Sequence, residues 1–262
     1  MPFHELTTED NINFLSNSKK SFRGTEIPKD FTNKAFEFAY DMTFGEKGEH
    51  RQHRSGADYN RRKGEIFINT FQGKLAEFAV YKFFNEAIEN YNISEPDLET
   101  YGSGQWDDCD LIINNKKISV KSTKSFGNLL LLETKDFDNE GTYIPNKEKY
   151  DFFILTRIGA SDSESNYKTD GEKLMRSKNM LYSDKLNEEV SNKDGLKNLI
   201  LNRKWYYDIP GFITHEELVD IIDEEFILPR NSMLNKYTRL QAENYYVQAG
   251  DMHDLGEIFD LL

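Results

Sequence analysis

Residues 110–125 read Asp-Leu-Ile-Ile-Asn-Asn-Lys-Lys-Ile-Ser-Val-Lys-Ser-Thr-Lys-Ser, with an apolar run on either side of an Asn-Asn pair. Asn adopts positive φ angles at little cost, so Asn114–Asn115 suits a two-residue hairpin turn. Folding the chain on this turn pairs Leu111 with Ile118. The stretch therefore predicts a β-hairpin, around which the other elements are expected to assemble.

Side chains alternate between the two faces of a strand, so the hairpin register sorts its residues into two sets. We expect one set to form the core face: Cys109, Leu111, Ile113, Ile118 and Val120. The other set is polar: Asp108, Asp110, Ser119 and Lys121. Directly opposed Cβ atoms lie about 5 Å apart and diagonal ones about 7–8 Å. The pattern thus brings carboxylates, a hydroxyl and an ammonium together on one surface.

Apolar periodicity predicts the elements on both sides of the hairpin. Helical spacing covers residues 32–44 and 68–89. Gly73 inside the second helix costs about 1 kcal/mol relative to Ala, which suggests a close approach by another segment. Short strands are expected at residues 129–132, 152–155 and 245–248. Helices followed by a hairpin-led sheet indicate an α/β or α+β core, with a mixed β-sheet flanked by helices.

The C-terminal part is predicted from local signals. Residues 159–198 are polar with little periodicity, so we expect a long elaboration outside the core. Pro210–Gly211 indicates a turn in a buried aromatic segment. Thr214-His-Glu-Glu217 matches a capping box and predicts the start of a helix. We expect one domain over residues 1–262, divided into a helical and basic-loop part at 1–67, a core at about 68–158 and an elaboration at 159–262.

Composition limits the class of protein. The chain has 262 residues, 37% of them hydrophobic, which is enough for one large folded domain. Its single cysteine, Cys109, cannot form an internal disulfide and excludes a multi-cysteine zinc site. The first residues lack the basic and apolar regions of a signal peptide, and no apolar run is long enough to span a membrane. We therefore expect a cytoplasmic protein.

The formal net charge of −13 opposes phosphate contact, but the charge is unevenly distributed. Between Lys47 and Lys63, six Lys and Arg side chains stand against Glu49 and Asp58, which gives a local charge of +4. Such a basic arm either contacts DNA or is a solvated loop. The candidate DNA-binding residues are Arg51, His53, Arg54, Arg61, Arg62, Lys63 and, after the hairpin, Lys124.

The polar face of the hairpin suits phosphodiester hydrolysis. Carboxylate oxygens of Asp110 and Asp108 are ligands that a hard cation such as Mg²⁺ prefers. The cation polarises the phosphoryl oxygen and lowers the pKa of a bound water. Lys121 beside it can orient that water and balance the charge that grows on the phosphate. The alternative is an ordinary cross-strand Asp–Lys pair on a solvated face.

Three short motifs occur in a fixed order: Gly73-Lys-Leu-Ala-Glu77 on a helix, Asp110-Leu-Ile-Ile on a strand and Ile118-Ser-Val-Lys121-Ser on the next. With the downstream strand that begins near Lys149, this order resembles the PD-(D/E)xK nucleases over roughly residues 70 to 158. The resemblance implies a restriction-endonuclease-like core. It also implies that Lys121 is the motif lysine and that the metal ligands are Asp110, the Val120 carbonyl and Glu77.

Ser119 departs from the family pattern, which usually has Glu or Asp at this position. Some restriction endonucleases read Ser-x-Lys and supply the glutamate from further along the chain. Glu133, twelve residues past Lys121, is one candidate for the second carboxylate. Glu77 is the other and is the one that we prefer. If neither reaches the site, the protein binds DNA without cutting it.

The resemblance and the large elaborations favour a sequence-specific double-stranded DNA endonuclease of the type II restriction class. We expect it to require Mg²⁺ and to act as a homodimer, because one active site per chain must cut both strands of a symmetric site. Two alternatives remain. One is a structure-specific nuclease of DNA repair or recombination, and the other is a catalytically inactive DNA-binding protein on the same fold.

Overall fold

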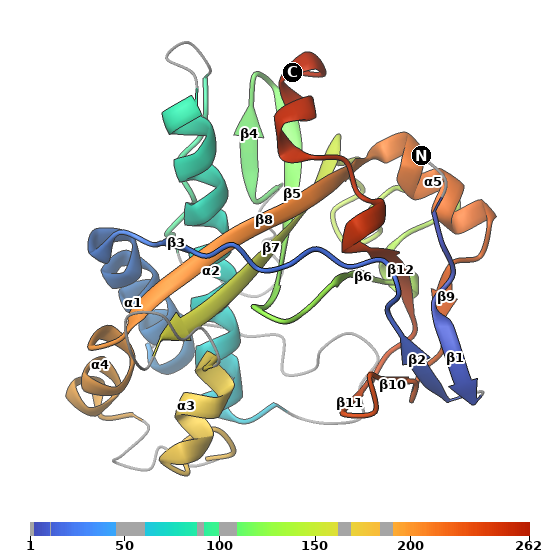
Figure 1. The fold of residues 1–262 in the computed structure, drawn as a ribbon. Coiled ribbons are helices and arrows are strands. Elements are labelled where there is room, and N and C mark those ends of the chain that lie inside the picture. Colours follow the sequence, from blue (N-terminus) through green and yellow to red (C-terminus); the bar gives the residue numbers. More distant parts are fainter. Residues whose placement is uncertain are drawn as a thin grey trace.

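The computed structural model describes residues 3–10, 12–45, 61–87, 92–99, 109–161, 169–183 and 191–262. It is a mixed α/β structure with several sheets (Figure 1). The central sheet has the strand order β3-β8-β7-β5-β4, in which β5 and β7 are parallel and the other neighbours antiparallel. Its strands are β3 (Thr25–Glu26), β8 (Lys204–Thr214), β7 (Phe152–Ser161), β5 (Lys116–Lys124) and β4 (Leu111–Ile113).

The predicted hairpin is confirmed as β4–β5. Leu111 pairs with Ile118, and Ile113 pairs with Lys116 across the turn. Asn114 and Asn115 have φ angles of 48° and 67°, as the two central residues of a type I′ turn require. The amide side chains of Asn make these angles accessible, so two adjacent residues fix the register of the whole hairpin.

Two smaller sheets lie beside the central one. An antiparallel sheet has the order β6-β12-β9. A second sheet has the order β1-β2-β10-β11, in which β2 and β10 are parallel. The strands are β6 (Leu129–Glu133), β12 (Asn244–Gln248), β9 (Ile227–Leu228), β1 (Thr7–Asp10), β2 (Asn13–Leu15), β10 (Met233–Leu234) and β11 (Thr238–Arg239).

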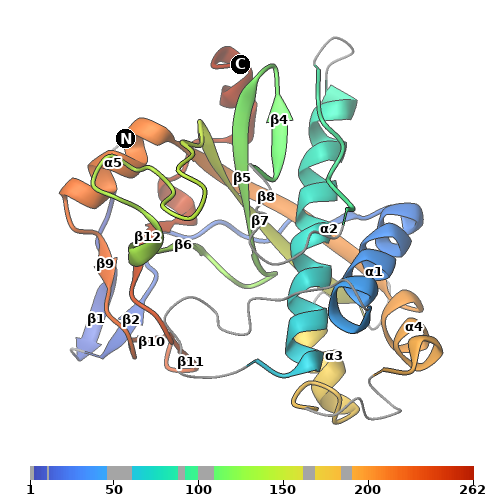
Figure 2. The same ribbon diagram turned by 180° about the vertical axis from the view of Figure 1, so that it is seen from behind.

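One face of the central sheet is covered by helix α2 (Lys63–Ala87) along its length, with α1 (Lys29–Phe44) packed against it. Both helices were predicted, and both begin a few residues earlier than expected. The upper part of α2 packs on β5 and β7, and its lower part packs on the far ends of β7 and β8 (Figure 2). Ile118, Val120 and Ile154 belong to this face.

The expectation that residues 159–198 lie outside the core is wrong for the part that the structure describes. Strand β7 continues to Ser161, and two helices follow, α3 (Gly171–Ser177) and α4 (Lys193–Leu201). Met175 and Ile200 are fully buried against α2 and the central sheet. The helices are short, so their few apolar residues gave too weak a periodicity to reveal a buried face.

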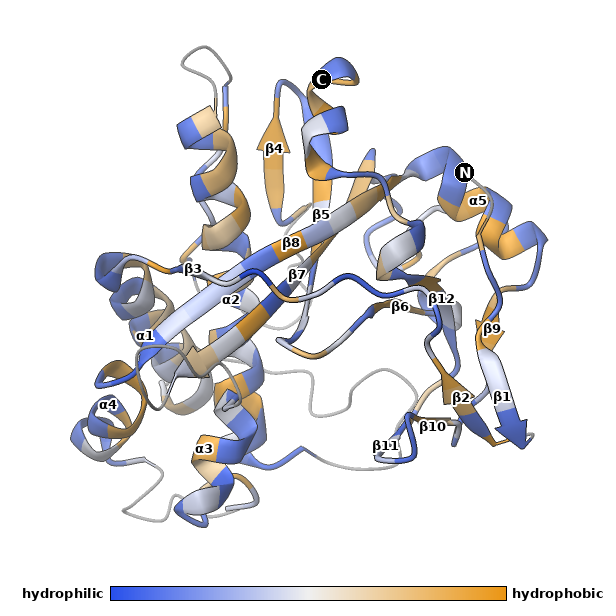
Figure 3. Ribbon diagram, in the orientation of Figure 1, coloured by the Kyte–Doolittle hydropathy of each residue, from blue (hydrophilic) through white to orange (hydrophobic). Residues whose placement is uncertain are grey.

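The other face of the central sheet is covered by α5 (His215–Asp223) and by β6 and β12. Thr214 and Glu217 form the predicted capping box at the start of α5. Figure 3 shows the alternation of hydrophobic and hydrophilic residues along this helix, whose Leu218 and Ile221 are buried. Three short 3-10 helices complete the described elements: Thr134–Asp136, Ala249–Asp251 and Leu255–Asp260.

Pro210–Gly211 is not the predicted turn but part of β8. Gly211 pairs with Leu155, and the pairing of β7 with β8 shifts register between Leu155 and Arg157, opposite Ile209 and Pro210. Proline has no N–H for the ladder, so a bulge accommodates it inside a sheet. A Cβ on Gly211 would lie 2.3 Å from the carbonyl oxygen of His253, so glycine is required there for close approach.

Two further expectations about single residues are wrong. A Cβ added at Gly73 would meet no described atom within 4 Å, so no described segment makes the expected close approach to this glycine. Cys109 is buried as expected, but it packs with Tyr150 and Phe153 on the opposite face from Leu111. The chain bends at Asp110, before β4 begins, and strand alternation fails at that point.

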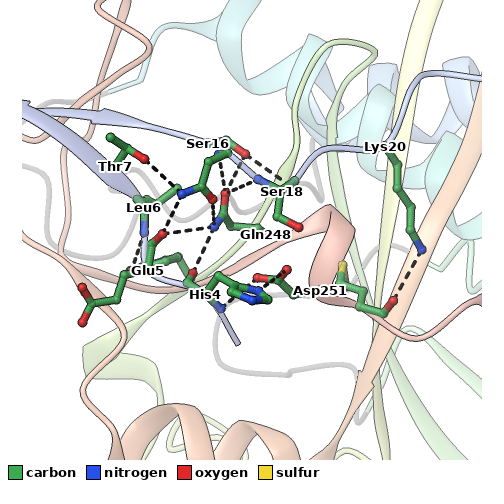
Figure 4. A network of polar contacts seen from close by, with 12 residues as sticks. His4, Glu5, Leu6, Thr7, Ser16, Ser18, Lys20, Gln248 and Asp251 are labelled. Atoms are coloured by element: carbon green, nitrogen blue, oxygen red, sulfur yellow. Dashed lines mark hydrogen bonds and ion pairs between the residues drawn. The ribbon is translucent and has the colours of Figure 1, made fainter. Parts of the chain in front are cut away.

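The N-terminal segment crosses the sheet face opposite α2 (Figure 1). The buried side chain of Gln248 in β12 holds it there (Figure 4). Its Oε1 accepts hydrogen bonds from Ser16 Oγ (2.9 Å) and from the main-chain N–H of Ser18 (3.1 Å). Its Nε2 donates to the carbonyl of His4 (3.0 Å), whose ring lies 3.0 Å from the Asp251 carboxylate. No helix within the described ranges is long and apolar enough to cross a membrane.

Candidate active site

The Asp110 carboxylate lies at the edge of the central sheet, against the strand that carries Lys121. Its Oδ2 accepts hydrogen bonds from the main-chain N–H of Val120 (2.6 Å) and from Ser119 Oγ (3.4 Å). The N–H of Asp110 donates to the Ile118 carbonyl (3.2 Å) and extends the hairpin ladder by one residue. The opposition of Asp110 and Ser119 predicted from the hairpin register is therefore present.

The Val120 carbonyl belongs to the same edge. In an extended strand the N–H and C=O of one residue point to the same side, and the Val120 N–H points to Asp110. Strand β4 begins at Leu111, so among the described residues its ladder with β5 stops short of Val120. A carboxylate and a main-chain carbonyl therefore lie together where the hairpin pairing ends.

Lys121 points to the other face of β5 and lines a groove of about 860 Å³. Its neighbour Ser119 on that face is 2% exposed and stands beside Phe153 of β7. The Lys121 ammonium forms no ion pair with any residue that the structure describes. It is therefore a half-buried cation whose charge faces the groove.

Glu133 lines the same groove as Lys121. It is the last residue of β6, paired with Asn244 of β12, and its side chain is 19% exposed. Lys135 Nζ lies 4.0 Å from its Oε2. Of the two candidates for the second carboxylate, Glu133 is the one that shares a surface with Lys121.

Glu77 lies instead on α2, and neither Glu77 nor Asp110 is among the residues that line the groove. Its carboxylate is 2.5 Å from Nζ of Lys74, one turn earlier on the helix. Lys74 is buried, and its ammonium also donates to the Asp97 carbonyl (2.7 Å) and lies over the Phe38 ring. The carboxylate of Glu77 thus neutralises a buried lysine, which the sequence pattern did not reveal.

Only some of the basic residues that were predicted to contact DNA lie within the described structure. Arg51, His53, Arg54 and Asp108 lie outside the described residues. Lys63 donates to the Thr43 carbonyl (2.7 Å) at the start of α2, where Arg61 and Arg62 precede it. None of these three lines the groove, whereas Lys124 does and is paired with Glu172 (2.7 Å).

Two groove cations were not predicted, Lys19 of the N-terminal segment and Arg239 of β11. Neither forms an ion pair with a described residue. Neither belongs to a recognisable sequence motif, so only the tertiary structure brings them to the groove that Lys121 lines.

Tyr150 lies beside the Asp110 end of the hairpin and packs with Cys109. Burial raises the pKa of the Tyr150 hydroxyl well above its usual value, and the negative charge of Asp110 raises that pKa further. Asn146 Nδ2 donates to this hydroxyl at 3.3 Å. The Tyr150 phenol therefore stays neutral at physiological pH and does not act as a base.

Comparison with known proteins does not name a class: no protein-family model, no curated protein and no solved structure matches this chain. The fold and the site together define a mixed α/β protein with a groove that is lined by lysine residues and by both polar and apolar side chains. Because one fold serves many functions, the activity has to be argued from the chemistry of the site.

Proposed function

We propose that this chain is a Mg²⁺-dependent nuclease on a restriction-endonuclease-like core, with its active site around Asp110 and Lys121. The observation that carries the proposal is the 2.6 Å hydrogen bond between Asp110 Oδ2 and the Val120 N–H. This bond holds the carboxylate against β5. The next residue of β5, Lys121, lines a large groove and forms no ion pair with a described residue.

The donor set fits a hard cation. The Asp110 carboxylate and the Val120 carbonyl offer oxygen atoms at one edge, and such oxygens are the ligands that Mg²⁺ prefers. Among the described residues, no group of three or more His, Cys, Asp or Glu side chains could hold a metal. The proposed set needs only two carboxylates and one carbonyl. When bound, Mg²⁺ would supply Lewis-acid polarisation of a phosphate and a more acidic water.

The protein's own residues have separate tasks. Lys121 Nζ donates hydrogen bonds to a phosphate oxygen and stabilises the negative charge that develops there. Ser119 Oγ donates to Asp110 Oδ2 and keeps the carboxylate oriented without acting as a ligand itself. The neutral phenol of Tyr150 and the apolar residues around it limit the access of water to one side of Asp110.

Glu133 takes the place of the missing motif acid in this proposal, with Glu77 as the alternative. Glu133 shares the groove with Lys121, whereas the Glu77 carboxylate already neutralises Lys74. A buried ammonium that lost its counter-ion would be strongly destabilised, so Glu77 is poorly suited to give up this partner. This proposal therefore prefers Glu133, whereas the sequence alone favoured Glu77.

The substrate proposed is double-stranded DNA, cut at specific sites by a homodimer, as in type II restriction enzymes. A single site per chain supports the dimer, because two symmetry-related copies are needed to cut both strands. The basic residues between 47 and 63 would add phosphate contacts.

The decisive experiment incubates the full-length protein with long duplex DNA in Mg²⁺, and in parallel with EDTA. Discrete fragments that appear only with Mg²⁺ are expected from the wild type. Asp110→Asn and Lys121→Ala should each lower the rate by about 100-fold or more. Lys116→Ala is the matched control, because this lysine lies on the same strand and pairs with Asp151 outside the groove.

Two other outcomes decide between the alternatives. Cutting confined to branched DNA would indicate a repair or recombination nuclease. Tight binding without cleavage in any divalent cation would indicate a DNA-binding protein without activity. Wild-type cleavage rates in Lys121→Ala would refute the assignment of the site.

A further inference from the structure

The wall of the groove that faces Lys121 is made by the β10–β11 hairpin and the residues that follow it. Asn235, Arg239 and Gln241 of this wall line the groove and are exposed. In Figure 2 the hairpin and α2 can be followed on either side of the lower end of β5. A molecule that lies in the groove would touch this wall and Lys121 at the same time.

Arg239 and Gln241 both line the groove. Arg239 is the last residue of β11, and Gln241 follows two positions later in a bend. Leu240 between them is buried and anchors the segment. Its N–H donates to the Ser232 carbonyl and its carbonyl accepts from the Asn231 N–H, both at 2.9 Å.

The hairpin is also fixed from behind. Met233 and Leu234 of β10 pair with β2, and the Asn235 N–H donates to the Phe14 carbonyl at 2.9 Å. Its turn residues Asn235 and Lys236 have φ angles of 49° and 67°, as in a tight type I′ turn. A rigid frame of this kind holds polar side chains in defined positions, which discrimination between similar ligands requires.

The chemistry of this wall matches the edges of base pairs. Arg forms two hydrogen bonds to guanine, and Gln forms two to adenine, in the major groove. Arg239, Lys19 and Lys121 form no ion pair with described residues, although they come from three separate segments. Their charges are therefore available to a polyanion that enters the groove.

We infer that the β10–β11 wall reads base sequence, with Arg239 and Gln241 as specificity-determining residues for duplex DNA. The inference rests on the proposed function, since it takes DNA as the occupant of the groove. It adds that recognition and cleavage use opposite walls of one groove. Lys121 faces the backbone, and the β10–β11 wall faces the base edges.

The test measures binding rather than cleavage, so that it does not depend on catalysis. The full-length protein selects from a random-sequence DNA duplex library in Ca²⁺, and the bound duplexes are sequenced. Wild type should enrich a consensus. Arg239→Ala and Gln241→Ala should each flatten one or two positions, with a loss of discrimination of about 5- to 100-fold there.

Lys236→Ala is the matched control, because Lys236 lies in the turn of the β10–β11 hairpin but pairs with Glu9 and does not line the groove. It should leave the consensus unchanged. Thermal melting of all variants shows whether each is folded. Where Arg239→Ala proves unstable, Arg239→Lys keeps the charge, removes the two-point hydrogen bond and should flatten the same position.

The outcomes separate the inference from the function it builds on. An unchanged consensus in folded Arg239→Ala and Gln241→Ala would overturn the inference, as would the absence of any wild-type consensus. A consensus that flattens as expected, in a protein that never cuts DNA with Mg²⁺, would support base reading and refute the nuclease.

Discussion

Arg157 and Asp208 form a two-point ion pair between β7 and β8, with Nε–Oδ1 and Nη2–Oδ2 distances of 2.7 and 2.6 Å. The Arg157 side chain is only 1% exposed. Its guanidinium also donates to the carbonyls of Lys20 (2.7 Å) and Ser21 (3.0 Å). One buried cation thus joins the central sheet to the N-terminal segment.

Removing this cation should strongly destabilise the protein. We expect Arg157→Ala to lower the free energy of unfolding by roughly 3–5 kcal/mol, because Asp208 would keep a nearly buried charge without its partner. Urea denaturation measures the loss. Lys204→Ala is the control, since it breaks a β8 ion pair with Glu26 that is about half exposed and should cost no more than about 1 kcal/mol. If both variants lost the same free energy of unfolding, the buried position of the Arg157–Asp208 pair would not be the reason for its effect.

The two candidate acids should respond in opposite ways to the loss of their charge. Glu133→Gln should lower the Mg²⁺-dependent cleavage rate by about 100-fold and leave the melting temperature nearly unchanged. Glu77→Gln should instead lower the free energy of unfolding by about 3 kcal/mol, because Lys74 remains buried. Cleavage kinetics and denaturation of both variants measure this. A Glu77→Gln protein that is stable and inactive would return the catalytic role to Glu77.

Two glycines of α2 should respond with opposite signs to the same substitution. Gly73→Ala should stabilise the protein by about 1 kcal/mol, because its Cβ meets no described atom within 4 Å and the helix gains a better residue. Gly64→Ala should destabilise it, because the Cβ would lie 2.0 Å from the Met180 carbonyl oxygen. Thermal melting compares the two. A loss of stability in Gly73→Ala would show that another segment does approach this position.

Tyr150 provides a pH measurement at the site. Burial raises the pKa of its hydroxyl above the unfolded value of about 10, so the folded state disfavours the ionised form. The resulting stability is fully present below about pH 10 and is lost as pH rises through the folded pKa. Ultraviolet titration, with Tyr150→Phe as the reference, follows the ionisation. Asp110→Asn should lower the pKa of Tyr150, and an unchanged pKa would mean that the two groups are further apart.

Local signals in the sequence were sufficient for the hairpin and for α5. Asn114 and Asn115 form the hairpin turn because both residues readily adopt positive φ angles. Thr214 and Glu217 form two hydrogen bonds with each other at the first residues of α5. The turn of the hairpin and the cap of α5 each depend on residues that are at most three positions apart in the chain. The side-chain alternation that follows from such a turn holds only as long as the strand is regular, as the bend at Asp110 shows.

The groove could not be predicted, because its parts are distant in sequence. Glu133 and Lys121 share the groove only because the chain leaves the central sheet after β5 and forms β6, which pairs with β12 in another sheet. Glu77 forms an ion pair with Lys74, and a short sequence motif does not show that this lysine is buried beside it. Arg239 reaches the groove through the pairing of β10 with β2. Such relationships come from tertiary contacts, which leave no periodic signal.

The hydrogen bond between Ser16 and Gln248 joins residues that are 232 positions apart in the chain. Ribosomes add about 5–20 residues per second, so the N-terminal segment waits on the order of 10–50 s for the strand that will hold it. Until then Lys19 and Arg239 have no common groove to line. If the groove binds DNA as proposed, a chain that ends before β12 would therefore lack the complete groove for that binding.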